Sequence, residues 1–252
     1  MSEPEAGLLT KADGARIAYR KRDGAAPGIV WLGGFKSEMT ATKATALDAW
    51  AEREGRAFVR FDYFGHGASS GDFRDGTVSR WRDDALDVVG ALTTGPQILV
   101  GSSMGAWLAL LAALKVPERI VALLLIAPAA DFTEDLLWAS LGDDVRRQIQ
   151  ERGEWLRPSA YDLSPYPITR ALIEDGRRHL LLAAPIGLSC PVRIVQGMRD
   201  PDVPWQHALK LVDRLGPDTE ITFVKDGDHR LSKPHEIALI QRTLSALVAD
   251  RT

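Results

Sequence analysis

Residues 98–108 of the chain have the sequence ILVGSSMGAWL, an apolar stretch, a G-x-S-x-G turn and a second apolar stretch. This pattern is typical of a buried strand that turns sharply into a helix. Glycines at positions 101 and 105 suit such a turn, because backbone approaches backbone there. We therefore expect Ser103 to be a nucleophile, and the Met104 N–H at the helix start to face negative charge on a substrate oxygen.

The composition is typical of a globular protein with one large core. The 252 residues are 45% hydrophobic and 26% charged, with a formal net charge of -3. We interpret residues 1–252 as a single domain with an insertion at about 128–189. The charge gives no basic footprint, so nucleic acid is not expected as a partner. The most apolar region, 107–130, contains charged residues at its centre, which argues against stable membrane insertion.

Cofactors, disulfides and targeting signals are not indicated. Cys190 is the single cysteine, so no intrachain disulfide can form. No cluster of His, Cys, Asp and Glu has ligand spacing, so we expect neither a metal nor another cofactor. The first residues, MSEPE, are acidic and lack an apolar stretch, which predicts a cytoplasmic protein. The sequence leaves the oligomeric state open.

Strand and helix patterns alternate along the chain after a hairpin predicted around residues 8–20. This alternation predicts an α/β fold with a doubly wound, mostly parallel sheet, whose active site lies at the carboxyl ends of the strands. Strands are expected at 29–32, 57–61, 98–100, 121–126, 192–196 and 221–224, and helices near 43–53, 78–92, 104–115, 205–215 and 235–249.

The insertion interrupts the alternation with helix-like segments that carry Trp138, Trp155, Tyr161 and Tyr166. We interpret it as a small helical cap over the carboxyl edge of the sheet. The alternative is a second packing layer that contacts no substrate.

A nucleophilic serine needs a base that takes its proton and an acid that orients the base. Asp200 follows the strand expected at 192–196, and His229 follows the strand expected at 221–224. The order Ser, Asp, His on successive loops is the order expected on this fold. Ser103, Asp200 and His229 are therefore the candidate catalytic residues.

Each partner of the serine has competitors. Asp202 and Asp131 also follow strands, but Asp200 comes first after its strand and Pro201 stiffens its turn. His66 lies on another loop at the carboxyl edge, where we expect it to order the loop rather than react. His207 and His235 are expected to be structural. His179, which follows two arginines, is expected to be exposed on a helix.

The second donor to a substrate oxyanion should come from the loop after the strand at 29–32. We assign it to the Phe35 N–H, since Gly33 and Gly34 let the backbone approach the substrate. Gly34 and Trp107 are the candidate substrate-binding residues.

With these motifs the chain resembles the alpha/beta-hydrolase fold family over nearly its full length. More narrowly, it is similar to a mitochondrial branch of that family that acts on acyl-protein thioesters and acyl glucuronide esters. The segments that carry this resemblance are Phe61-Asp62-Tyr63 with Gly65, residues 95–105, residues 197–205 and Asp228-His229-Arg230.

The residues and the resemblance together predict a serine hydrolase of carboxylic esters or thioesters with lipophilic acyl groups. Its substrate would be a small or acylated molecule. The alternatives are a small-ester carboxylesterase, a carbon–carbon bond hydrolase, and a non-catalytic binding module that keeps the fold.

Overall fold

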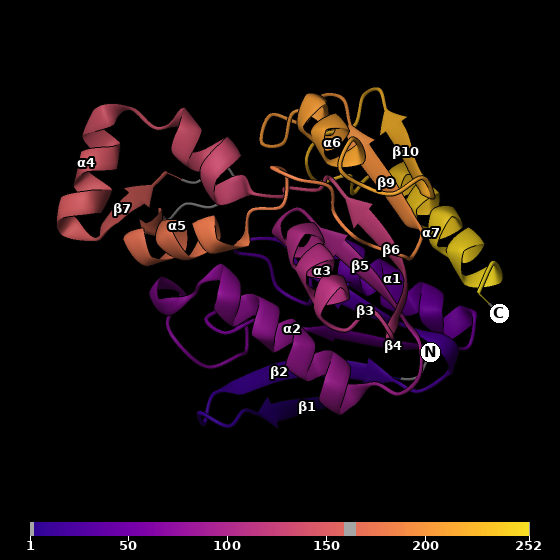
Figure 1. Ribbon diagram of the computed structural model, residues 1–252. Coiled ribbons are helices and arrows are strands. Elements are labelled where there is room, and N and C mark those ends of the chain that lie inside the picture. The colour runs from indigo at the N-terminus through magenta and orange to yellow at the C-terminus, as the bar shows by residue number, and fades with distance from the viewer. Residues whose placement is uncertain (1–2, 159–164, 252) are drawn as a thin grey trace.

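An eight-stranded sheet forms the centre of the computed structural model, which describes residues 3–158 and 165–251 (Figure 1). Its strand order is β1-β2-β4-β3-β5-β6-β9-β10. β2 pairs antiparallel with β1 and β4, and the other pairs are parallel. The strands are β1 (Glu5–Thr10), β2 (Arg16–Arg22), β3 (Ala25–Leu32), β4 (Arg56–Phe61), β5 (Gln97–Ser102), β6 (Ile120–Ile126), β9 (Val192–Gly197) and β10 (Thr219–Val224).

Helices cover both faces of this sheet. α2 (Val78–Leu92), α3 (Met104–Lys115) and α6 (Trp205–Val212) pack on one face, and α1 (Thr42–Arg53) and α7 (Pro234–Ala249) on the other. This double cover explains why the inner strands are apolar on both sides. The predicted doubly wound α/β fold is confirmed. In the described part of the chain no helix is long and apolar enough to cross a membrane.

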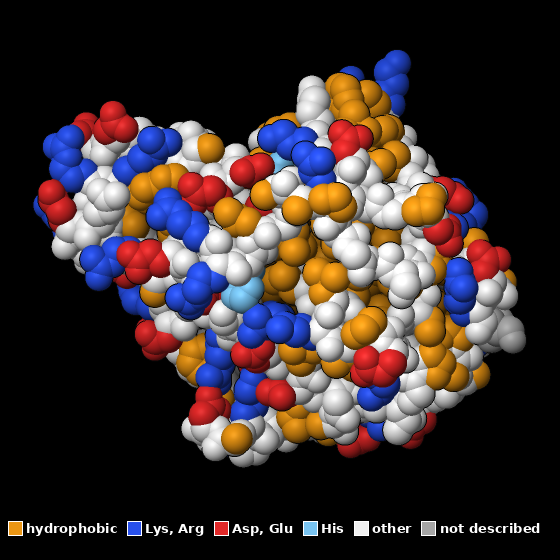
Figure 2. Space-filling model, in the orientation of Figure 1, with side chains coloured by type: hydrophobic (Ala, Val, Ile, Leu, Met, Phe, Trp, Pro, Cys, Tyr) orange, Lys and Arg blue, Asp and Glu red, His pale blue; other side chains and the backbone are white. Residues whose placement is uncertain are grey.

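The insertion, residues 128–189, lies between β6 and β9, at the left of Figure 1. It has a small apolar cluster of its own around Leu137 and Ile168, and charges of both signs cover its outer surface (Figure 2). The insertion was expected to be helical, but it also contains two short strands, β7 and β8, which pair antiparallel. Tyr161 lies outside the described residues. The elements are η2 (Thr133–Leu137), η3 (Trp138–Ser140), α4 (Asp143–Arg152), β7 (Glu154–Arg157), β8 (Tyr166–Thr169), α5 (Arg170–Gly176) and η4 (Arg177–His179).

Buried polar contacts attach the insertion to the sheet domain. Asp175 accepts hydrogen bonds from the Ser79 N–H and hydroxyl, at 2.7 and 2.8 Å. His179 was expected on an exposed helix face, which is wrong: its side chain is 12% exposed and its Nε2 lies 2.7 Å from Ser79 Oγ. The reason is that η4 packs against the start of α2 rather than facing solvent.

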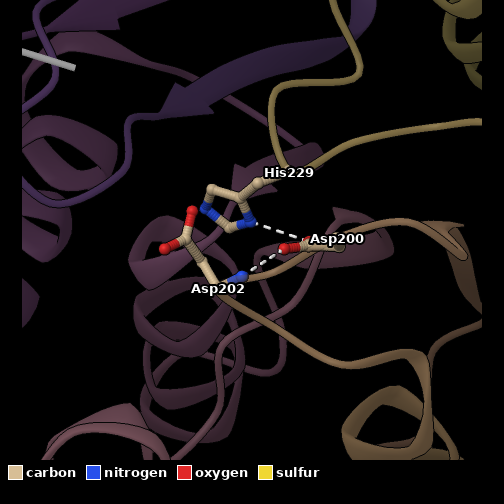
Figure 3. A group of neighbouring side chains, drawn as sticks. All are labelled: Asp200, Asp202 and His229. Atoms are coloured by element: carbon tan, nitrogen blue, oxygen red, sulfur yellow. Dashed lines mark hydrogen bonds and ion pairs between the residues drawn. The ribbon is translucent and has the colours of Figure 1, made fainter. Parts of the chain in front are cut away.

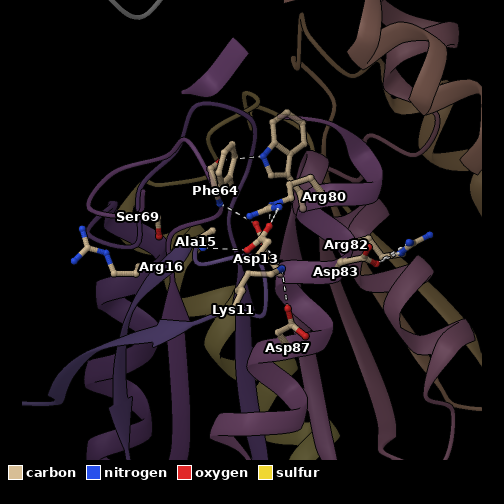
Figure 4. A network of polar contacts seen from close by, with 12 residues as sticks. Lys11, Asp13, Ala15, Arg16, Phe64, Ser69, Arg80, Arg82, Asp83 and Asp87 are labelled. Carbon is tan, nitrogen blue, oxygen red and sulfur yellow. Dashed lines mark hydrogen bonds and ion pairs between the residues drawn. The ribbon is translucent and has the colours of Figure 1, made fainter. Parts of the chain in front are cut away.

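A second polar network fixes the β1–β2 hairpin to α2 (Figure 4). Lys11 forms ion pairs with Asp84 and Asp87 of α2, and Arg80 pairs with Asp13 beside the turn. The same Asp84 carboxylate accepts the backbone N–H of Phe64, at 2.8 Å. Asp84 thus links the hairpin, α2 and the loop that follows β4.

A buried ion pair joins α1 to β4. The Arg60 Nη2 lies 2.8 Å from Asp48 Oδ2, and the exposed fractions of the two side chains are 8% and 6%. Arg60 also donates to the Met39 carbonyl, at 2.7 Å. A buried guanidinium needs its carboxylate, because water does not replace the lost partner.

We predict that Asp48→Asn lowers the free energy of unfolding by about 3 kcal/mol, since it leaves the Arg60 charge buried without a counter-ion. Urea denaturation measures this difference. The control is Glu174→Gln, which removes an exposed ion pair with Arg170 and should cost less than about 0.5 kcal/mol. Equal losses in the two variants would contradict the prediction.

Candidate active site

Ser103 occupies a strained turn between β5 and α3. Its backbone angles are φ 56° and ψ -119°, a region that side chains rarely adopt. Both flanking glycines are sterically required. A Cβ on Gly105 would lie 2.1 Å from the Leu32 carbonyl oxygen, and one on Gly101 would lie 2.4 Å from the Gly105 carbonyl oxygen. The turn therefore has the geometry that the G-x-S-x-G pattern indicated.

The three candidate catalytic residues form one hydrogen-bonded chain. The Ser103 Oγ lies 3.0 Å from His229 Nε2, and His229 Nδ1 lies 2.8 Å from Asp200 Oδ2. The Asp200 side chain is fully buried, and its Oδ1 accepts the N–H groups of Asp202 and Val203, at 2.9 and 2.8 Å. Because the carboxylate fixes a proton on Nδ1, Nε2 is the acceptor that faces the serine.

The competing acids do not take this place. Asp131 accepts the N–H groups of Leu181 and Leu182 instead, at 2.8 and 2.9 Å. In Figure 3, Asp202 lies on the other side of the imidazole from Asp200. Ligand atoms of Asp200, Asp202 and His229 lie within 4.8 Å of one another, but both His229 nitrogens already have partners. A metal ion would have to displace one of them.

The two expected oxyanion donors are the backbone N–H groups of Phe35 and Met104. The N–H groups of Phe35 and Met104 donate to no atom of the residues that the structure describes. The loop that carries Phe35 lies close to the serine, since a Cβ on Gly34 would be 3.4 Å from the Ser103 Cβ. The Phe35 N–H belongs to the loop after β3, and the Met104 N–H belongs to the start of α3. These are the two places from which a donor pair comes on this fold.

A cleft of about 420 Å³ opens at Ser103 and His229. The insertion supplies an apolar wall that includes Phe132, Leu136, Leu137 and Ile168. Gly34 lines the cleft as expected, but Trp107 does not. Trp107 is fully buried and its Nε1 donates to the His179 carbonyl at 3.2 Å, so it is a core residue and the expected substrate contact is corrected.

Lys43 lines the cleft and was not found by sequence reasoning. Its Nζ donates to the Arg230 carbonyl in the loop that carries His229. Burial is the main cause that lowers the Lys43 pKa to about 8. No local pattern could have identified this contact, because 187 residues separate the two partners.

Comparison with known proteins places the chain among hydrolases. Residues 26–238 match the model of the "Alpha/beta hydrolase family". The chain is 40% identical over 243 residues to the palmitoyl-protein thioesterase ABHD10, mitochondrial, of Mus musculus, covering 96% of this chain and 82% of that protein. The human protein of that name is 38% identical over the same share of this chain and 79% of its own length.

Solved structures give the same result. A putative hydrolase from Agrobacterium vitis S4 superposes with a TM-score of 0.94 at 45% identity, over 98% of this chain and 100% of that one. The mouse alpha/beta hydrolase domain-containing protein 10 superposes with a TM-score of 0.91 at 37% identity, over the same shares of both chains.

The matched relatives test two further predictions from the sequence. Hydrolysis of ester or thioester bonds is confirmed as the class of reaction. The expected cytoplasmic location is wrong, because all five matched relatives are named as mitochondrial proteins. The family match covers most of the chain and agrees with the sheet order and the turn at Ser103: the protein belongs to the alpha/beta hydrolase family.

Proposed function

We propose that the protein is a serine hydrolase that cleaves thioesters or esters of lipophilic acyl groups through an acyl-enzyme on Ser103. The observation that carries this proposal is the chain Ser103–His229–Asp200, with contacts of 3.0 and 2.8 Å, at the base of a cleft with an apolar wall. Nucleophile and base, and base and acid, thus lie within hydrogen-bond distance.

In the proposed reaction His229 Nε2 takes the proton of Ser103 while Oγ attacks the acyl carbonyl carbon. The N–H groups of Phe35 and Met104 hold the negative oxygen that develops. His229 then gives the proton to the leaving thiol or alcohol, and the acyl group stays on Ser103. Water, deprotonated by His229, cleaves this acyl-enzyme and restores the serine. Asp200 keeps the imidazole oriented and stabilises its positive charge.

We propose that the insertion acts as a cap whose apolar wall holds the acyl chain. Burial of each methylene contributes about 0.8 kcal/mol, so a long chain gains most from such a wall. The relatives named palmitoyl-protein thioesterase support a long acyl thioester as the substrate class.

We predict that Ser103→Ala lowers kcat for acyl thioesters by about a millionfold and abolishes labelling by a fluorophosphonate, because no other group then accepts the acyl chain. Steady-state rates and gel labelling of the purified protein measure both effects. Wild-type turnover in Ser103→Ala would refute the serine mechanism. A wild-type protein that neither reacts with the label nor hydrolyses any ester would favour a non-catalytic binding module.

We predict that Leu136→Trp shifts the acyl preference toward short chains. The indole ring is larger than the leucine side chain and fills space beside the apolar wall. If two methylenes lose their burial, kcat/KM for a long-chain thioester falls about tenfold while that for a butyryl thioester is unchanged. Rates on matched acyl series measure the shift. Leu209→Trp, on α6 outside the cleft and 37% exposed, is the control. Equal losses on short and long substrates would contradict the assigned wall.

A further inference from the structure

The loop with Phe35, residues 33–41, contains no helix or strand. Lys36 in this loop has a φ of 59°, a conformation that costs energy for a residue with a side chain. The loop has a hydrogen bond of its own, from the Ser37 N–H to the Gly34 carbonyl at 3.1 Å, and contacts from other parts of the chain add to it. One of these contacts holds the Lys36 N–H, in the peptide next to the Phe35 N–H.

His66 makes that contact from the loop after β4. Its Nε2 accepts the backbone N–H of Lys36, at 3.2 Å, and its Nδ1 lies 3.2 Å from the Phe64 carbonyl oxygen. A carbonyl oxygen only accepts, so the proton is on Nδ1 and Nε2 is the acceptor. One tautomer therefore satisfies both contacts.

The surroundings keep the ring in this position and uncharged. The side chain is 4% exposed and packs edge-to-face against Tyr63, Phe73 and Trp81, with ring centroids 5.1 to 5.7 Å apart. Burial lowers the pKa of His66 to about 4. Its acceptor nitrogen is thus unprotonated at neutral pH.

A second side chain of the same loop holds the far end of residues 33–41. Asp62 accepts the N–H of Met39 with Oδ1 at 2.6 Å, and the N–H of Ala68 with Oδ2 at 2.9 Å. The loop after β4 therefore binds the loop after β3 at two points. Of the two, only the His66 contact is adjacent to Phe35.

We propose that His66 is a positioning residue for the oxyanion hole: by accepting the Lys36 N–H it fixes the Phe35–Lys36 peptide, and through it the turn that presents the Phe35 N–H of the preceding peptide to the acyl oxygen. His66 touches no substrate and transfers no proton. The inference rests on the proposed serine mechanism and adds a role that the catalytic chain does not include.

Two substitutions separate this role from general packing. Gln places an amide oxygen near the position of Nε2 and can still accept the Lys36 N–H, while Asn places its amide near Nδ1 and can bond only to Phe64. We expect His66→Asn to lower kcat for p-nitrophenyl octanoate about tenfold to a hundredfold with KM within about twofold, because the oxyanion forms after binding. His66→Gln should stay within about threefold of the wild type.

The matched control is His207→Asn. His207 is equally buried, at 4% exposed, and its Nε2 lies 2.7 Å from the Ala130 carbonyl oxygen, away from residues 33–41. We expect kcat to change less in His207→Asn than in His66→Asn, while the melting temperatures of the two variants are similar. Equal kcat in His66→Asn and His66→Gln, or a loss that appears in KM, would overturn the proposal.

A measurement on the wild-type protein tests the geometry if the variants do not fold. ¹⁵N spectra of the histidine side chains should show His66 as the Nδ1–H tautomer at pH 7. An Nε2–H tautomer would overturn the proposal, because that nitrogen could then not accept the Lys36 N–H. Failure of the serine mechanism is recognised separately, since Ser103→Ala would then keep its activity.

Discussion

The site depends on one close approach of backbone, that of the start of α3 to the end of β3. Gly105 lies so near the Leu32 carbonyl that a Cβ would come within 2.1 Å of its oxygen. The loop of residues 33–41 begins where β3 ends, so this contact also sets the loop beside Ser103. The nucleophile and the proposed Met104 donor therefore lie at the start of α3, and the proposed Phe35 donor lies just after β3 in a loop that the ends of β3 and α3 hold beside Ser103.

The strained turn at Ser103 is held by its neighbours in the sheet. The Ser103 N–H donates to the Ile126 carbonyl at the end of β6, at 2.9 Å, and the Ser103 carbonyl accepts from Ala106 and Ala129, at 3.0 and 3.2 Å. A residue with positive φ persists when such bonds outweigh its cost. Since Ala129 lies near the start of the insertion, the bond from its N–H connects the serine to the segment that carries the apolar wall of the cleft.

Local patterns were sufficient to predict the sheet and the turn and to name the catalytic candidates. Each of these depends on a few consecutive residues in a strand or at its end. They failed where the answer depends on distant partners. Every residue of α3 from Met104 to Ala113 is buried, so no periodicity could show which way Trp107 points. The strands β7 and β8 have four residues each, too few for an alternating pattern. The expected location rested on the five letters MSEPE alone, and no property of the folded domain bears on it.

Two polar groups of the proposed site, the His229 imidazole and the Lys36 N–H, are each held by a partner one step further from Ser103. Asp200 divides its oxygens between His229 and two backbone N–H groups, so its carboxylate cannot turn without losing one contact. His66 stands in the same relation to the Lys36 N–H, and the Phe64 carbonyl also accepts from Trp81 Nε1 at 3.1 Å. A neutral imidazole suits this place, because it fixes a peptide without adding a charge beside a developing oxyanion. An acid could accept the same N–H, but its negative charge would oppose the oxyanion that the site must stabilise.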